Sequence, residues 1–88
     1  MSDIPDSLWF LYVLECADAS LYTGITNDVQ ARLITHNSGK GAKYTRGRTP
    51  VVLKAVFEYV TKSEALKAEY AFKKLKRTEK LKRIGSRN

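Results

Sequence analysis

Apolar positions along the chain predict three strands. Residues 8–15 (LWFLYVLE) are apolar at nearly every position and rich in aromatic and branched side chains, which at this length is typical of a strand covered on both faces. We expect this strand at the centre of a sheet. Residues 20–25 (SLYTGI) follow a short polar turn and alternate, so the two segments predict a hairpin. Residues 51–60 (VVLKAVFEYV) alternate in part and predict a third strand with one wetter face.

The length of the hairpin turn decides which side chains share a face of the sheet. A three-residue turn pairs Tyr12 with Gly24 and brings Tyr12 and Tyr22 to one face, whereas a two-residue turn separates the two tyrosines. The sequence leaves both registers open. In the third strand, regular alternation would place four apolar side chains on one face, Leu53, Ala55, Phe57 and Tyr59.

A first helix is predicted over residues 28–37. Asn27 followed by Gln30 three residues later resembles a capping box, and an apolar stripe follows at helical spacing. Residues 38–48 (SGKGAKYTRGR) then combine three glycines with four cations. We expect a mobile basic loop there.

Two further helices are predicted in the last third of the chain. Thr61 with Glu64 forms a second capping box, which begins a helix over residues 62–76. Thr78 and the run EKLKRI predict a short third helix that ends near Gly85. The element order is therefore β-β-α-β-α-α. It predicts an α+β fold in which a three-stranded antiparallel sheet is flanked by helices.

The length of 88 residues suits one domain over residues 1–88, with its core at about 8–77 and flexible ends at 1–7 and 85–88. No apolar run reaches the roughly 18 to 20 residues of a membrane-spanning helix. The first ten residues lack the basic segment that precedes the apolar part of a secretory signal. We expect a cytoplasmic protein without membrane contact, of undetermined oligomeric state. Cys16 is the only cysteine, which excludes an internal disulfide and a cysteine-clustered zinc site.

The net charge of +7 is unevenly distributed along the chain. Residues 1–35 contain one base and five acids, a net charge of −4, whereas residues 36–88 contain fifteen bases and four acids, a net charge of +11. Such asymmetry indicates a polyanionic partner, either nucleic acid or an acidic membrane surface. A well-solvated surface without a partner is the alternative.

Arg32 and His36 are the first candidates for chemistry. Their spacing of four residues stacks the two side chains on one face of the first predicted helix, beside the strand end Tyr22-Thr23-Gly24. A guanidinium and an imidazole held together suit the handling of a phosphate. Taken singly, a surface ion pair for Arg32 and a packing role for His36 are the ordinary interpretations.

Glu69 is the second candidate, because it borders the apolar stripe of the second predicted helix. At 100° per residue it lies about 40° from Ala65, a core position. A carboxylate at such a place must pair, shift its pKa or bind a cation. The pattern leaves a structural salt bridge and a metal ligand equally open.

These segments together carry a resemblance to a known family. The order LYVLEC, YTGITNDVQARLITH, GKGAKYTRG and EALKAEYAFKKL resembles the GIY-YIG endonuclease superfamily, over about residues 8–77, and within it the small single-domain bacterial proteins. Phe10-Leu11-Tyr12 stands at the first triplet of the family, where only the tyrosine is kept, and Tyr22-Thr23-Gly24 stands at the second. The spacing from the second triplet to Arg32 and His36 is more specific than either triplet.

The resemblance implies a phosphodiesterase site with one metal ion. The family's glutamate, here Glu69, holds a divalent cation, and Mg²⁺ or Mn²⁺ suits a lone carboxylate completed by water and phosphate oxygens. The family's arginine, here Arg32, stabilises the transition state. The tyrosines, here Tyr12 and Tyr22, orient or deprotonate the attacking water. His36 is suited to accept a proton or to hold the water or a tyrosine hydroxyl.

Gly24 has a supporting role, because a backbone or a phosphate is expected to approach closely there. Basic side chains are expected to bind nucleic acid. Some family members that cleave nucleic acid carry a lysine just after the second triplet. This chain has Ile25 at that position. The expected nucleic-acid-binding residues are Lys40, Lys43, Arg46, Arg48 and Lys73.

The leading hypothesis is a metal-dependent endonuclease that cleaves DNA, directed by branched, nicked or damaged structure rather than by sequence. A nucleic-acid-binding module with the same fold and little or no cleavage is the first alternative, with RNA as a further possible ligand. An interaction subunit whose basic face binds an acidic protein or RNA is the second. The charge distribution predicts binding that weakens steeply with salt.

Overall fold

The computed structural model describes residues 8–85. The ends predicted to be flexible were residues 1–7 and 85–88. Residues 1–7 and 86–88 lie outside the described residues, whereas Gly85 is the last residue of a helix. No helix in the described part of the chain combines the length and apolar character needed to cross a membrane.

Three strands form one antiparallel sheet: β1 (Trp9–Glu15), β2 (Leu21–Thr26) and β3 (Val52–Tyr59). Their order is β2-β1-β3, which confirms the prediction that the first strand is central. Four consecutive residues of β1, Leu11 to Leu14, are buried, so this strand is covered on both faces as its apolar run indicates.

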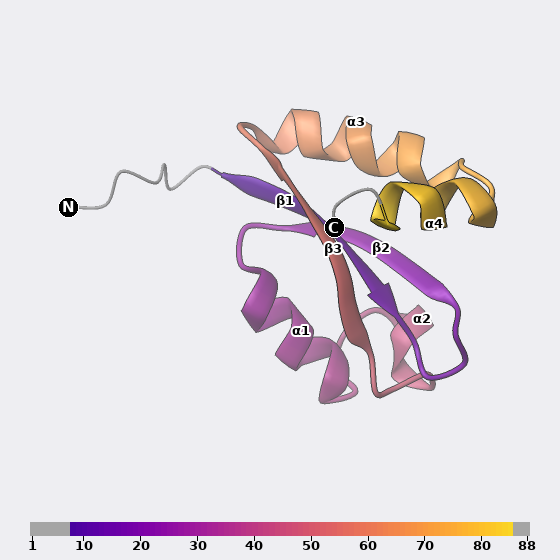
Figure 1. Ribbon diagram of the computed structural model, residues 1–88. Helices are drawn as coiled ribbons and strands as arrows, with labels where there is room; N and C mark the ends of the chain where they lie inside the picture. The colour runs from indigo at the N-terminus through magenta and orange to yellow at the C-terminus, as the bar shows by residue number, and fades with distance from the viewer. Residues whose placement is uncertain (1–7, 86–88) are drawn as a thin grey trace.

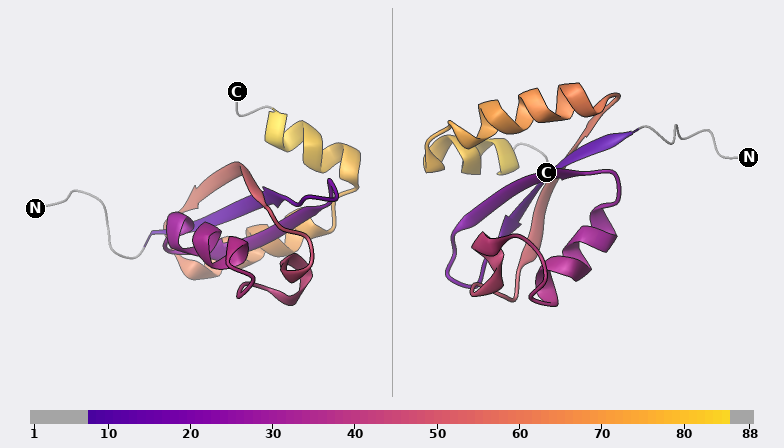
Figure 2. Two further views of the ribbon diagram at one scale, coloured as in Figure 1. Left: turned by 90° about the horizontal axis from the view of Figure 1, so that it is seen from below. Right: turned by 180° about the vertical axis from the view of Figure 1, so that it is seen from behind.

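Four helices flank the sheet: α1 (Val29–Asn37), α2 (Lys43–Arg46), α3 (Lys62–Lys73) and α4 (Arg77–Gly85). The views agree that α1 and α2 lie on one side of the sheet and that α3 and α4 lie on the other (Figures 1 and 2). The predicted α+β fold is therefore confirmed. The prediction of a loop over residues 38–48 was wrong in part, because the one-turn helix α2 lies within it.

The hairpin between β1 and β2 has a three-residue turn. The Cys16 N–H donates to the Ser20 carbonyl at 2.8 Å, and Ala19 adopts a left-handed conformation with φ of 70°. Tyr12 is consequently paired with Gly24 across the two strands. Of the two registers that the sequence left open, the structure has the one that brings Tyr12 and Tyr22 to the same face.

The predicted faces of β3 were wrong at Leu53. Val13 pairs with Ala55, but the next residue, Leu14, pairs with Leu53, so Lys54 is an extra residue in a β-bulge. The bulge reverses the alternation. Leu53 packs with the cluster on the α1 face, whereas Ala55 packs with the cluster on the α3 face.

The starts of two helices show one wrong and one correct capping prediction. The N-cap of α1 is Asp28 rather than Asn27, since the Asp28 carboxylate accepts a hydrogen bond from the Ala31 N–H at 3.1 Å. The N-cap of α3 is Thr61 as predicted, and its hydroxyl accepts from the Glu64 N–H at 3.1 Å. The helix α3 ends at Lys73, three residues before the predicted end.

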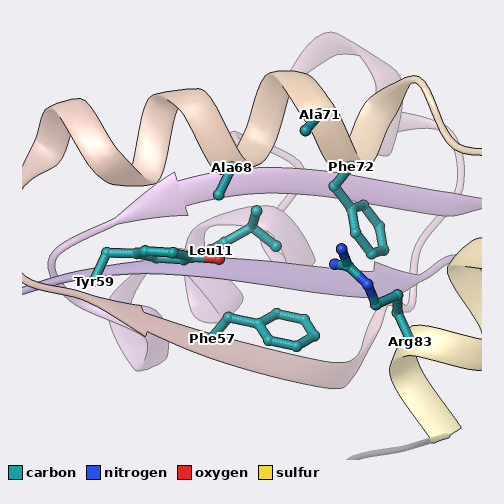
Figure 3. Close-up of a pocket in the computed structure, with 7 residues that line it drawn as sticks. All are labelled: Leu11, Phe57, Tyr59, Ala68, Ala71, Phe72 and Arg83. Atoms are coloured by element: carbon teal, nitrogen blue, oxygen red, sulfur yellow. The ribbon is translucent and has the colours of Figure 1, made fainter.

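The core has two layers, one on each face of the sheet. Buried Leu11, Val13, Ala55 and Phe72 form the layer under α3. A cavity of about 90 Å³ remains beside this layer, and Arg83 of α4 extends into it toward the rings of Phe57 and Phe72 (Figure 3). The layer on the α1 face contains Tyr12, Leu14, Cys16 and Val51, and the candidate functional side chains adjoin it.

Candidate active site

A chain of hydrogen bonds runs from the central strand to α2. The hydroxyl oxygen of Tyr12 lies 3.0 Å from Nε2 of His36, and Nδ1 of His36 lies 2.8 Å from the hydroxyl oxygen of Thr45. The Thr45 hydroxyl in turn donates to the carbonyl of Ala42 at 2.9 Å. Tyr12, His36 and Thr45 are all buried, so no bulk water competes for these bonds.

The chain of bonds assigns the tautomer of His36. The single hydroxyl proton of Thr45 goes to the Ala42 carbonyl, so the Thr45 oxygen accepts a hydrogen bond and Nδ1 of His36 must carry a proton. Burial and then the positive charge of Arg32 lower the pKa of His36, which keeps the imidazole neutral. Nε2 is therefore unprotonated and accepts the hydroxyl proton of Tyr12.

The two tyrosine rings and the imidazole form one cluster on the α1 face. Ring centroids of Tyr12 and Tyr22 lie 6.3 Å apart, and those of Tyr22 and His36 lie 5.2 Å apart. Burial raises the pKa of both phenols, while Arg32 lowers it through a hydrogen bond to Tyr12 and through its charge at Tyr22. The charge of Glu69 raises the pKa of both phenols. Arg32 of α1 and Glu69 of α3 are thus both electrostatic neighbours of the phenols.

Glu69 itself forms a salt bridge. Its Oε2 lies 3.3 Å from Nζ of Lys73, one helical turn later, and its side chain is 20% exposed. Of the two roles left open by the sequence, the structure shows the ion pair. The charge of the carboxylate nevertheless raises the pKa of both phenols.

The carboxylate of Glu69 is a ligand of the kind that a hard divalent cation takes. Oxygen ligands are those that Mg²⁺ and Mn²⁺ prefer. Among residues 8–85 no three His, Cys, Asp or Glu side chains gather into a metal-binding group. A cation at Glu69 would have to complete its shell with water and phosphate oxygens.

Two glycines allow these side chains to lie against the backbone. A Cβ atom at Gly24 would stand 2.6 Å from the Tyr12 hydroxyl oxygen, and one at Gly41 would overlap the imidazole of His36. The close approach expected at Gly24 is therefore made by the Tyr12 side chain. Gly24 and Gly41 therefore leave the room that the side chains of Tyr12 and His36 occupy.

A model of the GIY-YIG catalytic domain matches residues 8–82. The chain belongs to the GIY-YIG family. Membership points to a nuclease-type hydrolase that acts on nucleic acid, and it confirms the resemblance seen in the sequence.

Relatives of similar size extend this likeness. The UPF0213 protein of Cupriavidus necator is 56% identical over 75 residues, which cover 85% of this chain and 82% of the relative. A UPF0213 protein of Staphylococcus epidermidis is 57% identical over 75 residues, covering 85% of this chain and 92% of the relative. The match therefore covers most of each relative.

Two solved structures are similar to the chain. The solution NMR structure of a UPF0213 protein from Bacillus halodurans has a TM-score of 0.59 at 47% identity, over 89% of this chain and 83% of that chain. The solution NMR structure of a protein from E. faecalis has a TM-score of 0.64 at 43% identity, over 98% of this chain and 90% of that chain.

Tyr44 packs against the tyrosine cluster of this GIY-YIG domain, and Arg48 packs against Tyr44. The ring of Tyr44 stacks on Tyr22 with centroids 6.0 Å apart, and the guanidinium carbon of Arg48 lies 4.1 Å from the Tyr44 centroid. The Arg48 guanidinium also donates to the Asp18 carboxylate at 3.0 Å and to the Tyr44 carbonyl at 2.7 Å. Arg48, predicted to bind nucleic acid, thus joins the α2 segment to the hairpin turn.

The other basic residues predicted to bind nucleic acid are exposed. Lys40, Lys43 and Arg46 are exposed in and before α2, where the Arg46 guanidinium donates to the Gly41 carbonyl at 3.4 Å. Lys73 is exposed on α3 and pairs with Glu69. Exposed cations are therefore present in both helical layers.

Sequence reasoning missed three residues of the site: Gly41, Tyr44 and Thr45. A helix of four residues carries no periodic pattern, so nothing in the run KYTR indicates that Thr45 is buried while its neighbours are exposed. The glycine at position 41 was visible, but its role depends on the position of His36.

Proposed function

We propose that the protein is a metal-dependent endonuclease that hydrolyses phosphodiester bonds in DNA, directed by strand structure or damage rather than by sequence. The observation that carries the proposal is the chain of bonds from Thr45 through His36 to Tyr12, with an unprotonated Nε2 toward the phenol. Such a chain is suited to remove a proton from an attacking water. The acting groups are Tyr12, Tyr22, Arg32, His36 and Glu69.

Proton transfer begins at the attacking water. The Tyr12 oxygen takes the water proton while its own hydroxyl proton passes to Nε2 of His36, so the phenol need not ionise on its own. This relay matters because burial raises the pKa of Tyr12 and disfavours a free phenolate. The Thr45 oxygen holds the Nδ1–H of the resulting imidazolium. Tyr22, the second phenol on this face, orients the water.

Charge stabilisation comes from Arg32 and from the carboxylate of Glu69. The guanidinium of Arg32 supplies two donors to the phosphate oxygens as negative charge develops there. Glu69 would hold the divalent cation, which when bound polarises a phosphoryl oxygen and lowers the pKa of bound water. Lys73 must then release the Glu69 carboxylate, and its ammonium becomes available to a neighbouring phosphate.

A plasmid-nicking assay tests this proposal. We expect supercoiled plasmid to be nicked with Mg²⁺ or Mn²⁺ but not with chelator, and at least about a hundredfold more slowly by Glu69→Gln and Arg32→Ala. Glu64→Gln, which removes the same charge near the start of α3, is the matched control. Cutting that survives both Glu69→Gln and Arg32→Ala belongs to a contaminant, and the proposal then fails.

Recognition of the substrate would depend mainly on phosphates. Exposed Lys40, Lys43 and Arg46 offer charge without a fixed base-reading geometry, which supports binding that is nearly indifferent to sequence. A panel of duplex, nicked, flap and junction substrates identifies the preferred structure.

A second candidate function is nucleic-acid binding with little cleavage. The salt bridge between Lys73 and Glu69 favours it, because the ammonium occupies the carboxylate that would hold the cation. Salt-dependent DNA binding without any metal-stimulated nicking would support this function instead.

A further inference from the structure

We propose that the outer surface of α3 binds an unpaired nucleotide, with Tyr70 as the platform on which its base stacks. The inference rests on the proposed function for the position of the cleaved phosphate, next to Glu69. It assigns a substrate class, nucleic acid with single-stranded nucleotides beside the cut. We call the surface formed by Leu66, Tyr70, Lys73 and Lys74 the α3 outer patch.

The α3 outer patch combines exposed apolar side chains with cations. Tyr70 is 66% exposed and Leu66, one helical turn earlier, is 46% exposed. The ammonium of Lys74 lies 4.1 Å from the centroid of the Tyr70 ring. Lys73 is also exposed, and Lys67 adds a further cation on the same helix. Aromatic rings interleaved with lysines are the composition of surfaces that bind single strands.

The position of Tyr70 links the patch to the candidate active site. Glu69 and Tyr70 are consecutive residues of α3, so their side chains differ by about 100° around the helix axis. Each has a lysine one turn later, with Lys73 3.3 Å from the Glu69 carboxylate and Lys74 over the Tyr70 ring. The two pairs are adjacent on α3. Glu69 acts on the phenols through its charge, whereas the Tyr70 ring is exposed to solvent. A strand whose phosphate lies at Glu69 would present its neighbouring nucleotide to Tyr70.

The chemistry of Tyr70 selects unpaired bases. In a duplex the faces of each base are covered by its neighbours, and an exposed phenol can stack only on a base that has left the stack. The lysines of the patch bind phosphates of either form and do not distinguish single strands from duplex. Tyr70 is therefore the discriminating residue of the α3 outer patch.

Fluorescence anisotropy tests the inference with a labelled oligonucleotide, either single-stranded or annealed to its complement, in chelator so that no cleavage occurs. We expect Tyr70→Ala to weaken single-strand binding about tenfold and duplex binding less than about twofold. Tyr70→Phe keeps the ring and should match the unaltered protein. Ile34→Ala, which removes a side chain that is 69% exposed on α1, is the control for lost apolar surface.

Three results would overturn the inference. They are an unchanged affinity of Tyr70→Ala for single strands, an equal loss on single strand and duplex, and a dimer that Tyr70→Ala converts to monomer, which would make the patch a protein interface. Melting curves confirm that each variant is folded. Because no metal is present, the outcome is independent of cleavage. Single-strand binding that depends on Tyr70, without nicking, would uphold this inference and refute the proposed nuclease. Nicking by a protein whose single-strand binding does not depend on Tyr70 would refute this inference and uphold the nuclease.

Discussion

Nδ1 of His36 lies 2.8 Å from the hydroxyl oxygen of Thr45, and both side chains are completely buried. This bond joins α1 to α2 and decides which imidazole nitrogen carries the proton. The short helix α2 is thus part of the site, since Thr45 fixes the Nδ1–H tautomer of His36. Only that tautomer leaves Nε2 free to accept from Tyr12.

The first prediction concerns Thr45→Val. The change removes the acceptor for the Nδ1–H and leaves it buried without a partner, which should destabilise the protein by about 1–3 kcal/mol. Cleavage should fall by about tenfold or more, because the proton relay through His36 loses its fixed tautomer. Thr45→Ser keeps the oxygen and should retain both stability and activity. Equal activity of the valine and serine variants would contradict the relay.

The second prediction concerns pH. The pKa of His36 is lower in the folded chain, through burial and Arg32, than the value of about 6.5 it has when unfolded. The unfolded state therefore binds a proton first as the pH falls, so the folded state should lose stability as pH falls below about 6.5. Urea titrations between pH 5 and 8 measure this loss. The His36→Gln variant should lack this component, and an identical pH dependence in that variant would refute the assignment.

The third prediction concerns Gly24→Ala. The new methyl group would stand 2.6 Å from the Tyr12 hydroxyl oxygen and 2.8 Å from its ring carbon, and must displace the phenol from His36. We expect a loss of about 1–3 kcal/mol of stability together with reduced cleavage. Gly47→Ala is the matched control, since no atom lies within 4 Å of the added methyl there. Thermal melts of the two variants measure the loss of stability, and their nicking rates measure the reduced cleavage.

The fourth prediction concerns Lys73→Met. Removing the ammonium frees the Glu69 carboxylate for a cation. A partly exposed pair of this kind is worth about 0.2–1 kcal/mol, so the Mn²⁺ concentration for half-maximal binding should fall by up to about fivefold. DNA binding should weaken slightly because one phosphate contact is lost. Lys67→Met changes the charge equally at another place on α3. Calorimetric titration with Mn²⁺ should show no shift for that control.

Local patterns predicted the sheet well. The apolar run ending at Glu15 specified a strand buried on both faces, and the three-residue turn was one of only two that the spacing allowed. The capping box of Thr61 and Glu64 marked the start of α3 correctly because both residues act within one helical turn.

The errors arise where distant contacts override local patterns. Leu53 lies on the unexpected face because the bulge at Lys54 depends on pairing with β1. Asp28 rather than Asn27 caps α1, and the Thr26 hydroxyl accepts from the Asp28 N–H at 3.0 Å to hold that start. Thr45 could not be assigned, because its role exists only once α2 packs against His36.

The bulge in β3 has a consequence for the tyrosine pair. A β-bulge bends the strand that contains it, and here the extra residue Lys54 lies in β3, the edge strand that carries neither Tyr12 nor Tyr22. The opposite pairing, from Phe10 with Thr26 to Glu15 with Leu21, advances one residue at a time. An insertion or deletion near Lys54 would thus alter β3 at its edge of the sheet, while the spacing between the rings of Tyr12 and Tyr22 is preserved.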